Sequence, residues 1–166
     1  MSSVTSGDAD ARRRKRRLTN AIKESLRELS IQLSLLNHQV GARLELKDVD
    51  LDCLDLVARY GPLSPSALAR RAGLHPATMT GILDRLQRAG WITRERDPEA
   101  ADRRAVSVRV LRERGGEILR LYAGMNAATK KLCSSYEPEQ LAVIADFLRR
   151  TTEAGRDATE ALTASS

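Results

Sequence analysis

The sequence has few aromatic residues, few cysteines and no long apolar run. Aromatic residues make up 3% of the 166 residues, while leucine and alanine are abundant, which favours helices over a β-sandwich. Cys53 and Cys133 build no disulfide framework, and such low cysteine usage suits a reducing cytosol better than secretion. No apolar run approaches membrane-spanning length, and none follows the N-terminal basic residues to form a signal peptide. We therefore expect a cytoplasmic protein of one domain, without a membrane partner.

Residue types that carry catalysis are also scarce. The chain has two histidines, and it shows no glycine-rich phosphate loop, no Cys/His spacing of a metal site and no nucleophile–base arrangement. We therefore expect no enzyme activity, no catalytic residue, no cofactor and no metal.

The positive charge is concentrated in one short run. The formal net charge is +6, from 28 basic and 22 acidic residues, and residues 12–17 read RRRKRR. Without these six cations the basic and acidic residues are equal in number, so attraction to nucleic acid elsewhere must come from local placement. We expect residues 1–17 to be a disordered basic arm that contacts DNA phosphates. The alternative is that the run is the solvated, frayed start of the first helix.

The stretch from residue 73 to 90 predicts a helix with one buried and one polar face. Pro76 suits the first helical position, and Gly90 suits a left-handed helix end. An apolar stripe recurs at spacings of three and four residues, at Met79, Ile82, Leu83, Leu86 and Ala89. The opposite face is polar, with small residues near its start, as a helix in a DNA groove requires. It consists of Thr78, Thr80, Gly81, Asp84, Arg85 and Arg88.

A basic hairpin follows this helix. Trp91 and Ile92 begin one strand, and the valines of VSVRV (106–110) alternate with polar residues in the return strand. The connection, roughly residues 96–104, ends in Asp102-Arg103-Arg104. Arginines at the tip of such a hairpin can enter the minor groove of DNA. We interpret the hairpin as a wing.

Two shorter helices are expected before the polar-faced helix. The first covers about residues 48–60 and ends at Gly61-Pro62, and the second covers about 65–72, with Ser64 as its N-cap and Gly73 after it. Helix, short helix, tight turn and helix form the helix-turn-helix pattern. With the hairpin added, residues 46–111 predict a winged helix.

Long helices are expected on both sides of the winged helix. The first, within residues 18–45, carries a heptad-like seam before Gly41, made of Ile22, Leu26, Leu29, Leu33, Leu36 and Val40. We interpret it as a dimerisation helix; the alternative is a long core helix within one chain. Residues 112–161 predict C-terminal dimerisation helices, the last of which begins at Glu137-Pro138, and residues 162–166 a frayed tail. The expected fold is therefore mainly α with a small β-hairpin wing.

Two stretches of the chain resemble the MarR family of transcriptional regulators. YGPLSPSALARRAGLHPATMTGILDRLQRAGWI (60–92) is similar to the family's helix-turn-helix, and DRRAVSVRV (102–110) is similar to its wing motif. Where the family usually has Leu-Thr-x-x-Gly, this chain has Leu-Arg-Glu-Arg-Gly (111–115), which removes a hydroxyl helix cap. The resemblance implies a sequence-specific, ligand-responsive repressor that binds a pseudo-palindromic DNA operator as a homodimer, associated with the nucleoid.

The resemblance also implies roles for individual residues. Asp102 matches an acidic wing residue that braces an arginine, Arg104 matches the arginine of the minor groove, and Arg103 is placed to reach phosphate. For Arg85 and Arg88 the alternative is a solvated helix face paired with Asp84. The other implied DNA contacts are Ser64, Pro76, Ala77, Thr78, Thr80, Gly81 and Arg85.

Effector binding is implied only by the resemblance. Family members bind small phenolic or other lipophilic acids between the dimer helices and the winged helix, and Asn37, His38 and Cys53 are the candidates near such a cleft. A histidine near a helix end is more often structural, and Cys53 in its apolar stretch fits an inert buried thiol better than a redox sensor. The alternatives in function are a non-specific architectural DNA-binding protein and a winged-helix protein-interaction module.

Overall fold

A computed structural model describes residues 3–96 and 105–164 of the chain. The chain divides into two compact units, Met1–Leu44 and Glu45–Ser166. The described part is mostly helical, with one antiparallel sheet of two strands. The predicted fold class, mainly α with a small β-hairpin wing, is therefore confirmed.

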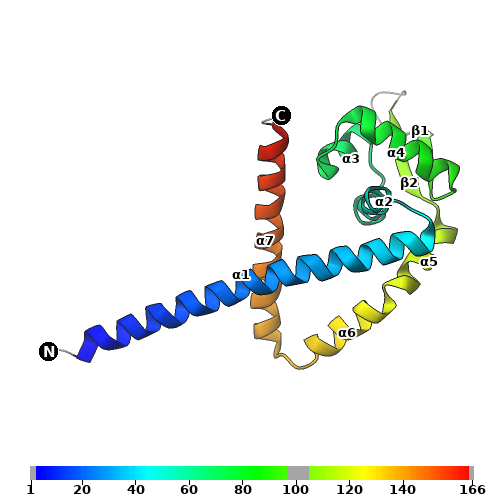
Figure 1. Ribbon diagram of the computed structural model, residues 1–166. Coiled ribbons are helices and arrows are strands. Elements are labelled where there is room, and N and C mark those ends of the chain that lie inside the picture. The colour runs from blue at the N-terminus through cyan, green and yellow to red at the C-terminus, as the bar shows by residue number, and fades with distance from the viewer. Residues whose placement is uncertain (1–2, 97–104, 165–166) are drawn as a thin grey trace. The chain divides into compact units, whose positions relative to one another are not determined.

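The first unit is a helix, α1 (Ser3–Leu44) (Figure 1). The prediction of a disordered arm is corrected for residues 3–17, which are helical. Alanine and arginine are good helix formers, and Arg12 pairs with Asp8 one turn earlier at 2.7 Å. Gly41 lies inside the helix, because one glycine costs only about 1 kcal/mol relative to alanine. The helix ends at Leu44, and Glu45 follows with a positive φ of 56°.

Three helices of the second unit form the helix-turn-helix (Figure 1). They are α2 (Asp48–Tyr60), α3 (Pro65–Ala72) and α4 (Pro76–Arg88). Gly73 has φ 64°, the left-handed conformation that lets the chain turn tightly from α3 toward α4. Their apolar faces meet in one core, whose buried members are Leu51, Leu54, Val57, Leu68, Ala69, Met79, Ile82, Leu83 and Leu86.

The predicted end of α4 is confirmed, with one difference. Gly90 has φ 74°, and Trp91 N donates to Leu86 O at 2.9 Å, which satisfies a carbonyl at the helix end. Ala89 was predicted to belong to the buried stripe but is exposed. It occupies the C-cap position after Arg88, where the stripe no longer faces the core.

The hairpin pairs β1 (Ile92–Arg96) with β2 (Val106–Val110). In the antiparallel register Ile92 lies opposite Val110, and Arg96 lies opposite Val106. Trp91, Ile92 and Val108 are buried, so the base of the wing belongs to the winged-helix core. Leu63 extends the sheet by one bridge, with Val108 N donating to Leu63 O at 2.8 Å.

Three further helices complete the second unit: α5 (Arg112–Leu121), α6 (Ala123–Cys133) and α7 (Pro138–Ala164). Helix α5 begins without a side-chain cap, as the missing hydroxyl predicts. The expected fraying from residue 162 is corrected for residues 162–164, which continue α7. None of the described helices has the length and hydropathy that crossing a membrane requires. Large apolar side chains of these three helices stay exposed: Leu119, Met125, Leu132, Val143, Ile144, Phe147, Leu148 and Leu162.

Candidate nucleic-acid interface

The start of α4 presents small and polar residues to solvent. His75 is the N-cap, and its Nδ1 accepts a hydrogen bond from Ala77 N at 3.2 Å. Pro76 occupies the first turn, as predicted, and Thr80 Oγ1 donates to Pro76 O at 3.1 Å. Pro76, Ala77, Thr78 and Thr80 are exposed and Gly81 is half-buried. The structure thus brings these predicted contact residues together on one accessible helix face.

Ser64 has the capping role that its position predicts. Its side chain accepts a hydrogen bond from Ala67 N at 3.2 Å, which satisfies one of the free amides at the start of α3. Its hydroxyl also lies 3.1 Å from the hydroxyl of Ser66. A contact of Ser64 with DNA stays a prediction beside this structural role.

Arg85 has a partner that the sequence analysis missed. Its Nε donates to Asp50 Oδ2 at 2.8 Å, and its Nη2 donates to Asp50 Oδ1 at 2.6 Å. Asp50 lies on α2 and is 2% exposed, so the arginine supplies the charge-assisted bonds that a buried carboxylate requires. The hydrogen bonds to Asp50 raise the pKa of Arg85 further above its ordinary value.

This pair corrects one interpretation of Arg85. The guanidinium is paired with Asp50, not with Asp84, and it connects α4 to α2. A contact of Arg85 with DNA stays a prediction. Asp84 instead forms an ion pair with Arg94 of β1, which connects the exposed side of α4 to the base of the wing. Arg88 donates from Nε to the main-chain O of Asp84 at 3.2 Å, so it has the local role expected for a late helix position.

A second arginine holds the end of α4. The guanidinium of Arg114, on α5, lies 3.7 Å from the centroid of the Trp91 ring, a cation–π distance. Its Nη1 also donates to Ala89 O at 2.6 Å, a main-chain carbonyl at the C-cap of α4. Asp50–Arg85 and Arg114–Trp91 therefore fix α4 at two places, and its start stays exposed.

The described part of the structure does not test the predicted residues of the wing tip or of the effector cleft. Asp102, Arg103 and Arg104 lie outside the described residues. Asn37 and His38 belong to the first unit, and Cys53 belongs to the second. Their shared role in a cleft therefore stays a prediction. Within the described part of the chain, no cluster of three or more His, Cys, Asp or Glu residues could hold a metal ion.

Cys53 has the environment of an inert thiol. It is 1% exposed, and burial, together with the charges of Asp52 and Asp50, raises its pKa to about 11. The thiolate is the reactive form, so the folded protein presents very little of it at neutral pH. Its side chain lies in the wall of a cavity of about 320 Å³ beside Val49 and Leu56.

We expect Cys53 to resist alkylation at pH 7.5 until the protein unfolds, while the exposed Cys133 reacts at once. Because the pKa of the Cys53 thiol is higher in the folded than in the unfolded state, its neutral form stabilises the fold at pH values below the unfolded pKa of about 8.5. That contribution should be lost as the pH rises through the folded value of about 11. Iodoacetamide labelling followed by mass spectrometry, with a Cys133→Ser control, measures the resistance of Cys53 to alkylation. Rapid labelling of Cys53 in the folded protein would show an accessible thiol.

Comparison with known proteins agrees with this geometry. A model of the MarR family matches residues 46–106. The uncharacterized HTH-type transcriptional regulator YcgE of Bacillus subtilis strain 168 is 32% identical over 121 residues, which cover 72% of this chain and 77% of YcgE. The HTH-type transcriptional repressor YetL of the same strain is 31% identical over 78 residues, covering 47% of this chain and 46% of YetL.

A solved structure supports the fold. FabT of Streptococcus pneumoniae, in complex with DNA, has a TM-score of 0.64 and 21% identity, covering 84% of this chain and 99% of the FabT chain. The identity with YcgE extends over more than two thirds of both proteins, and the family match spans most of the winged helix. The chain therefore belongs to the MarR family of winged helix-turn-helix transcriptional regulators.

Proposed function

We propose that the protein binds a pseudo-palindromic DNA operator as a homodimer and represses transcription there until a small effector binds. The observation that carries this proposal is the exposed start of α4, where Pro76, Ala77, Thr78 and Thr80 face solvent while the opposite face of the helix is fixed in the core. YetL, a similar protein, is a repressor. Such a regulator would act at the nucleoid, in the cytoplasm.

The start of α4 has the chemistry that binding in a major groove needs. Small side chains at Ala77 and Gly81 let the helix come close to the bases, and the hydroxyls of Thr78 and Thr80 can hydrogen-bond to base edges or phosphates. The dipole at a helix start favours the negatively charged backbone. Ser64, at the start of α3, is proposed as a further phosphate contact.

The wing is proposed to read the adjacent minor groove. Arg104→Ala should weaken operator binding by roughly 1–3 kcal/mol, the scale of one specific contact, without changing the dimer. Arg103 is proposed to contact phosphate. Arginine suits the minor groove because it is always charged and less strongly hydrated than lysine.

Asp102→Ala tests whether Asp102 positions Arg104 or acts only through its own negative charge. If Asp102 holds Arg104 in place, Asp102→Ala should cause part of the loss of operator affinity that Arg104→Ala causes. A purely electrostatic effect would instead strengthen binding, because a negative charge disappears. Gel-shift titration at fixed salt measures both variants. Tighter operator binding by Asp102→Ala would show that Asp102 is only a surface charge.

Effector binding is supported by a groove within the second unit. A hollow of about 620 Å³ is lined by residues of α2, α3, the turn after α3 and the C-terminal half of α7, among them Leu56, Leu74 and Arg156. Arg71 stacks over the ring of Tyr60 at 4.1 Å in the same wall. Apolar walls with arginines fit a lipophilic or phenolic acid. Asn37 and His38 remain candidates on α1. Release of bound operator by added benzoate tests effector response.

The deciding experiment is selection of bound sites from random duplex DNA, followed by footprinting. A footprint confined to one palindrome supports an operator-specific homodimer. Even coverage would support the architectural alternative, and absence of DNA binding would favour a protein-interaction module. The polar face at the start of α4 favours the first outcome.

A further inference from the structure

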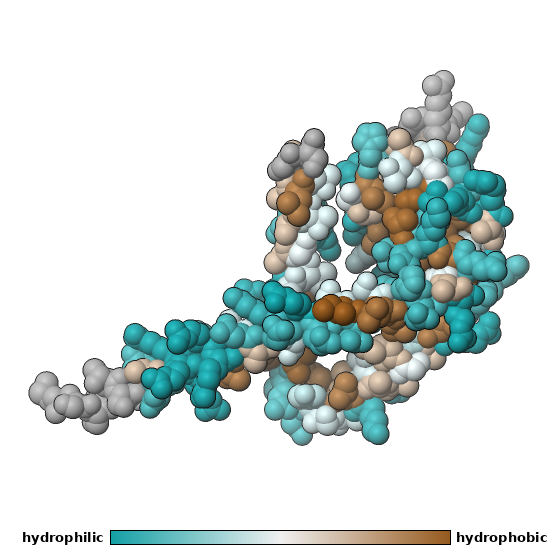
Figure 2. Space-filling view, in the orientation of Figure 1, coloured by the Kyte–Doolittle hydropathy of each residue, from teal (hydrophilic) through white to brown (hydrophobic). Residues whose placement is uncertain are grey.

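Helix α1 carries a row of cations on one face that groove binding by α4 does not use. Arg12, Arg16, Lys23 and Arg27 follow one another at spacings of four, seven and four residues, which keep them on one side of a helix. We call this row the basic stripe. All four residues are exposed, and Figure 2 shows hydrophilic side chains over the N-terminal half of α1.

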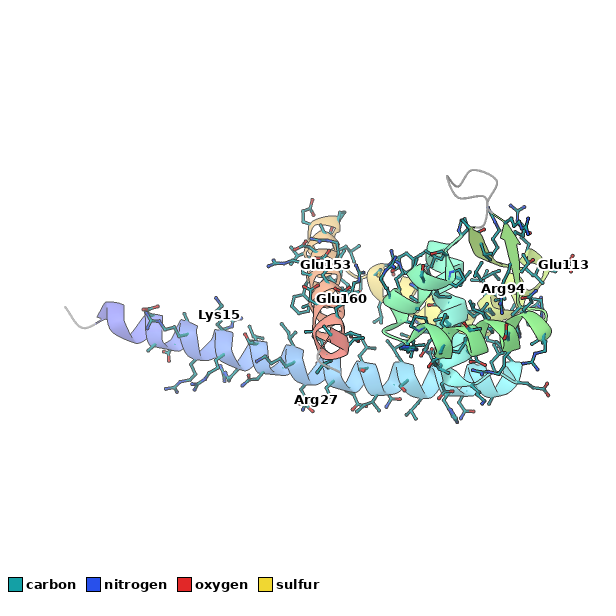
Figure 3. All side chains as sticks on the ribbon, turned by 90° about the horizontal axis from the view of Figure 1, so that it is seen from above. Lys15, Arg27, Arg94, Glu113, Glu153 and Glu160 are labelled. Carbon is teal, nitrogen blue, oxygen red and sulfur yellow. The ribbon has the colours of Figure 1, made fainter. Side chains whose placement is uncertain are left out.

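The opposite face of α1 carries acids beside its cations. Arg14 and Arg17 share the opposite face with three acidic residues, Asp10, Glu24 and Glu28. Figure 3 shows Lys15 and Arg27 extending from different sides of the helix. Between residues 12 and 27 the basic stripe includes no acidic residue. The basic stripe is therefore more positively charged than the opposite face of α1.

The ion pairs at the ends of the basic stripe are too exposed to neutralise it. Arg12 lies 2.7 Å from Asp8, with 80% of its side chain exposed. Arg27 lies 3.7 Å from Glu24, with 75% of its side chain exposed. Such surface pairs contribute little and are screened by salt, so a multivalent anion can displace them.

The basic stripe and the apolar seam occupy different sides of α1. At 3.6 residues per turn, the seam residues Ile22, Leu26 and Leu29 lie between about a fifth and a third of a turn from the middle of the stripe. Dimerisation through the seam therefore leaves the four cations accessible.

We propose that the basic stripe binds the phosphate backbone of duplex DNA flanking the operator, an inference that rests on the proposed function. The stripe extends over the 16 residues from Arg12 to Arg27, about 22 Å of helix, over which one DNA strand places a phosphate about every 3.4 Å. Arg12 and Arg16 repel each other at a spacing of four residues, and phosphates relieve this repulsion. The six cations of residues 12–17 equal the formal net charge of +6, and two of them, Arg12 and Arg16, belong to the stripe.

Two charge-matched double variants of the full-length protein test the stripe. Arg16→Gln with Lys23→Gln removes two stripe cations, and Arg14→Gln with Arg17→Gln removes two cations from the opposite face. Glutamine is a good helix former, and circular dichroism checks that both variants stay folded. The probe is a labelled random-sequence duplex, with binding measured between about 50 and about 200 mM salt.

The stripe variant should flatten the slope of log K against log salt by about 1.8, because each phosphate contact contributes about 0.9. Across this salt range the parent should therefore lose about tenfold more affinity than the variant. The control should change the slope by less than half as much. The proposal would be overturned if the stripe variant kept the salt slope of the parent, or if the control variant flattened the slope as much as the stripe variant does. The probe contains no operator, so the stripe test does not depend on whether the selection experiment finds an operator. The two proposals can therefore fail separately.

Discussion

Arg85→Ala should lower the free energy of unfolding by about 3–5 kcal/mol, the cost of breaking a buried ion pair. Asp50 is 2% exposed and would lose both hydrogen bonds from the guanidinium. Because 39% of the Arg85 side chain is exposed, water can enter the vacated space, so we expect the lower part of this range. Urea unfolding followed by far-UV circular dichroism measures the change.

Arg88→Ala is the matched control, because Arg88 is an arginine of the same helix whose Nε bonds to a main-chain oxygen on the surface. It should cost less than about 0.5 kcal/mol. Arg85→Lys should lose much of the stability as well, since lysine cannot make the two parallel bonds. Replacing both members, as Asp50→Leu with Arg85→Leu, should recover part of the loss.

Stability and DNA affinity together decide the role of Arg85. If Arg85→Ala unfolds like the Arg88→Ala control yet binds DNA poorly, Arg85 is a DNA contact, and the ion pair is a minor surface feature. If stability falls as expected, reduced DNA binding follows from a loosened α4.

The caps and turns could be predicted because they depend on a few neighbouring residues. Ser64 accepts from Ala67 N, Pro76 begins α4, and Gly90 adopts a positive φ. Each follows from backbone geometry that one residue type satisfies best. The exposed face at the start of α4 follows from the same local pattern.

The Asp50–Arg85 pair could not be predicted from helical periodicity, because its members are 35 residues apart in sequence. A signal was present in α2, where Asp50 has the spacing of four and seven residues to Leu54 and Val57, both buried. An acid on an apolar stripe requires a partner. The sequence does not say which of several arginines supplies it.

The helix ends were predicted too short because the prediction followed hydrophobicity. Apolar spacing reports which face a helix buries, whereas helix formation also depends on propensity and on pairs four residues apart. The start of α1 and the end of α7 have few apolar residues, yet both are helical. In α7, Arg149 pairs with Asp146 and Glu153, which supports the helix without burial.

Leu29→Asp and Leu33→Asp should each convert the proposed homodimer into monomers. Leu29 and Leu33 are 41% and 39% exposed in the single chain, although they continue the heptad-like seam of α1. A dimer that pairs this seam would bury two copies of the new carboxylate without a partner, at a cost on the order of several kcal/mol. Sedimentation at several protein concentrations should show the parent as a dimer and the variants near the 18.3 kDa of one chain.

Leu35→Asp is the control that separates the seam from general loss of apolar surface. Leu35 is 55% exposed and lies two residues beyond Leu33, which places it on nearly the opposite side of the helix. This variant should stay dimeric. Because the winged-helix core residues are buried within one chain, the seam variants should keep their helical circular dichroism while losing tight operator binding. A dimer that survives Leu29→Asp and Leu33→Asp, or one that Leu35→Asp disrupts equally, would show that the chains pair through another surface, such as the exposed apolar residues of α5–α7.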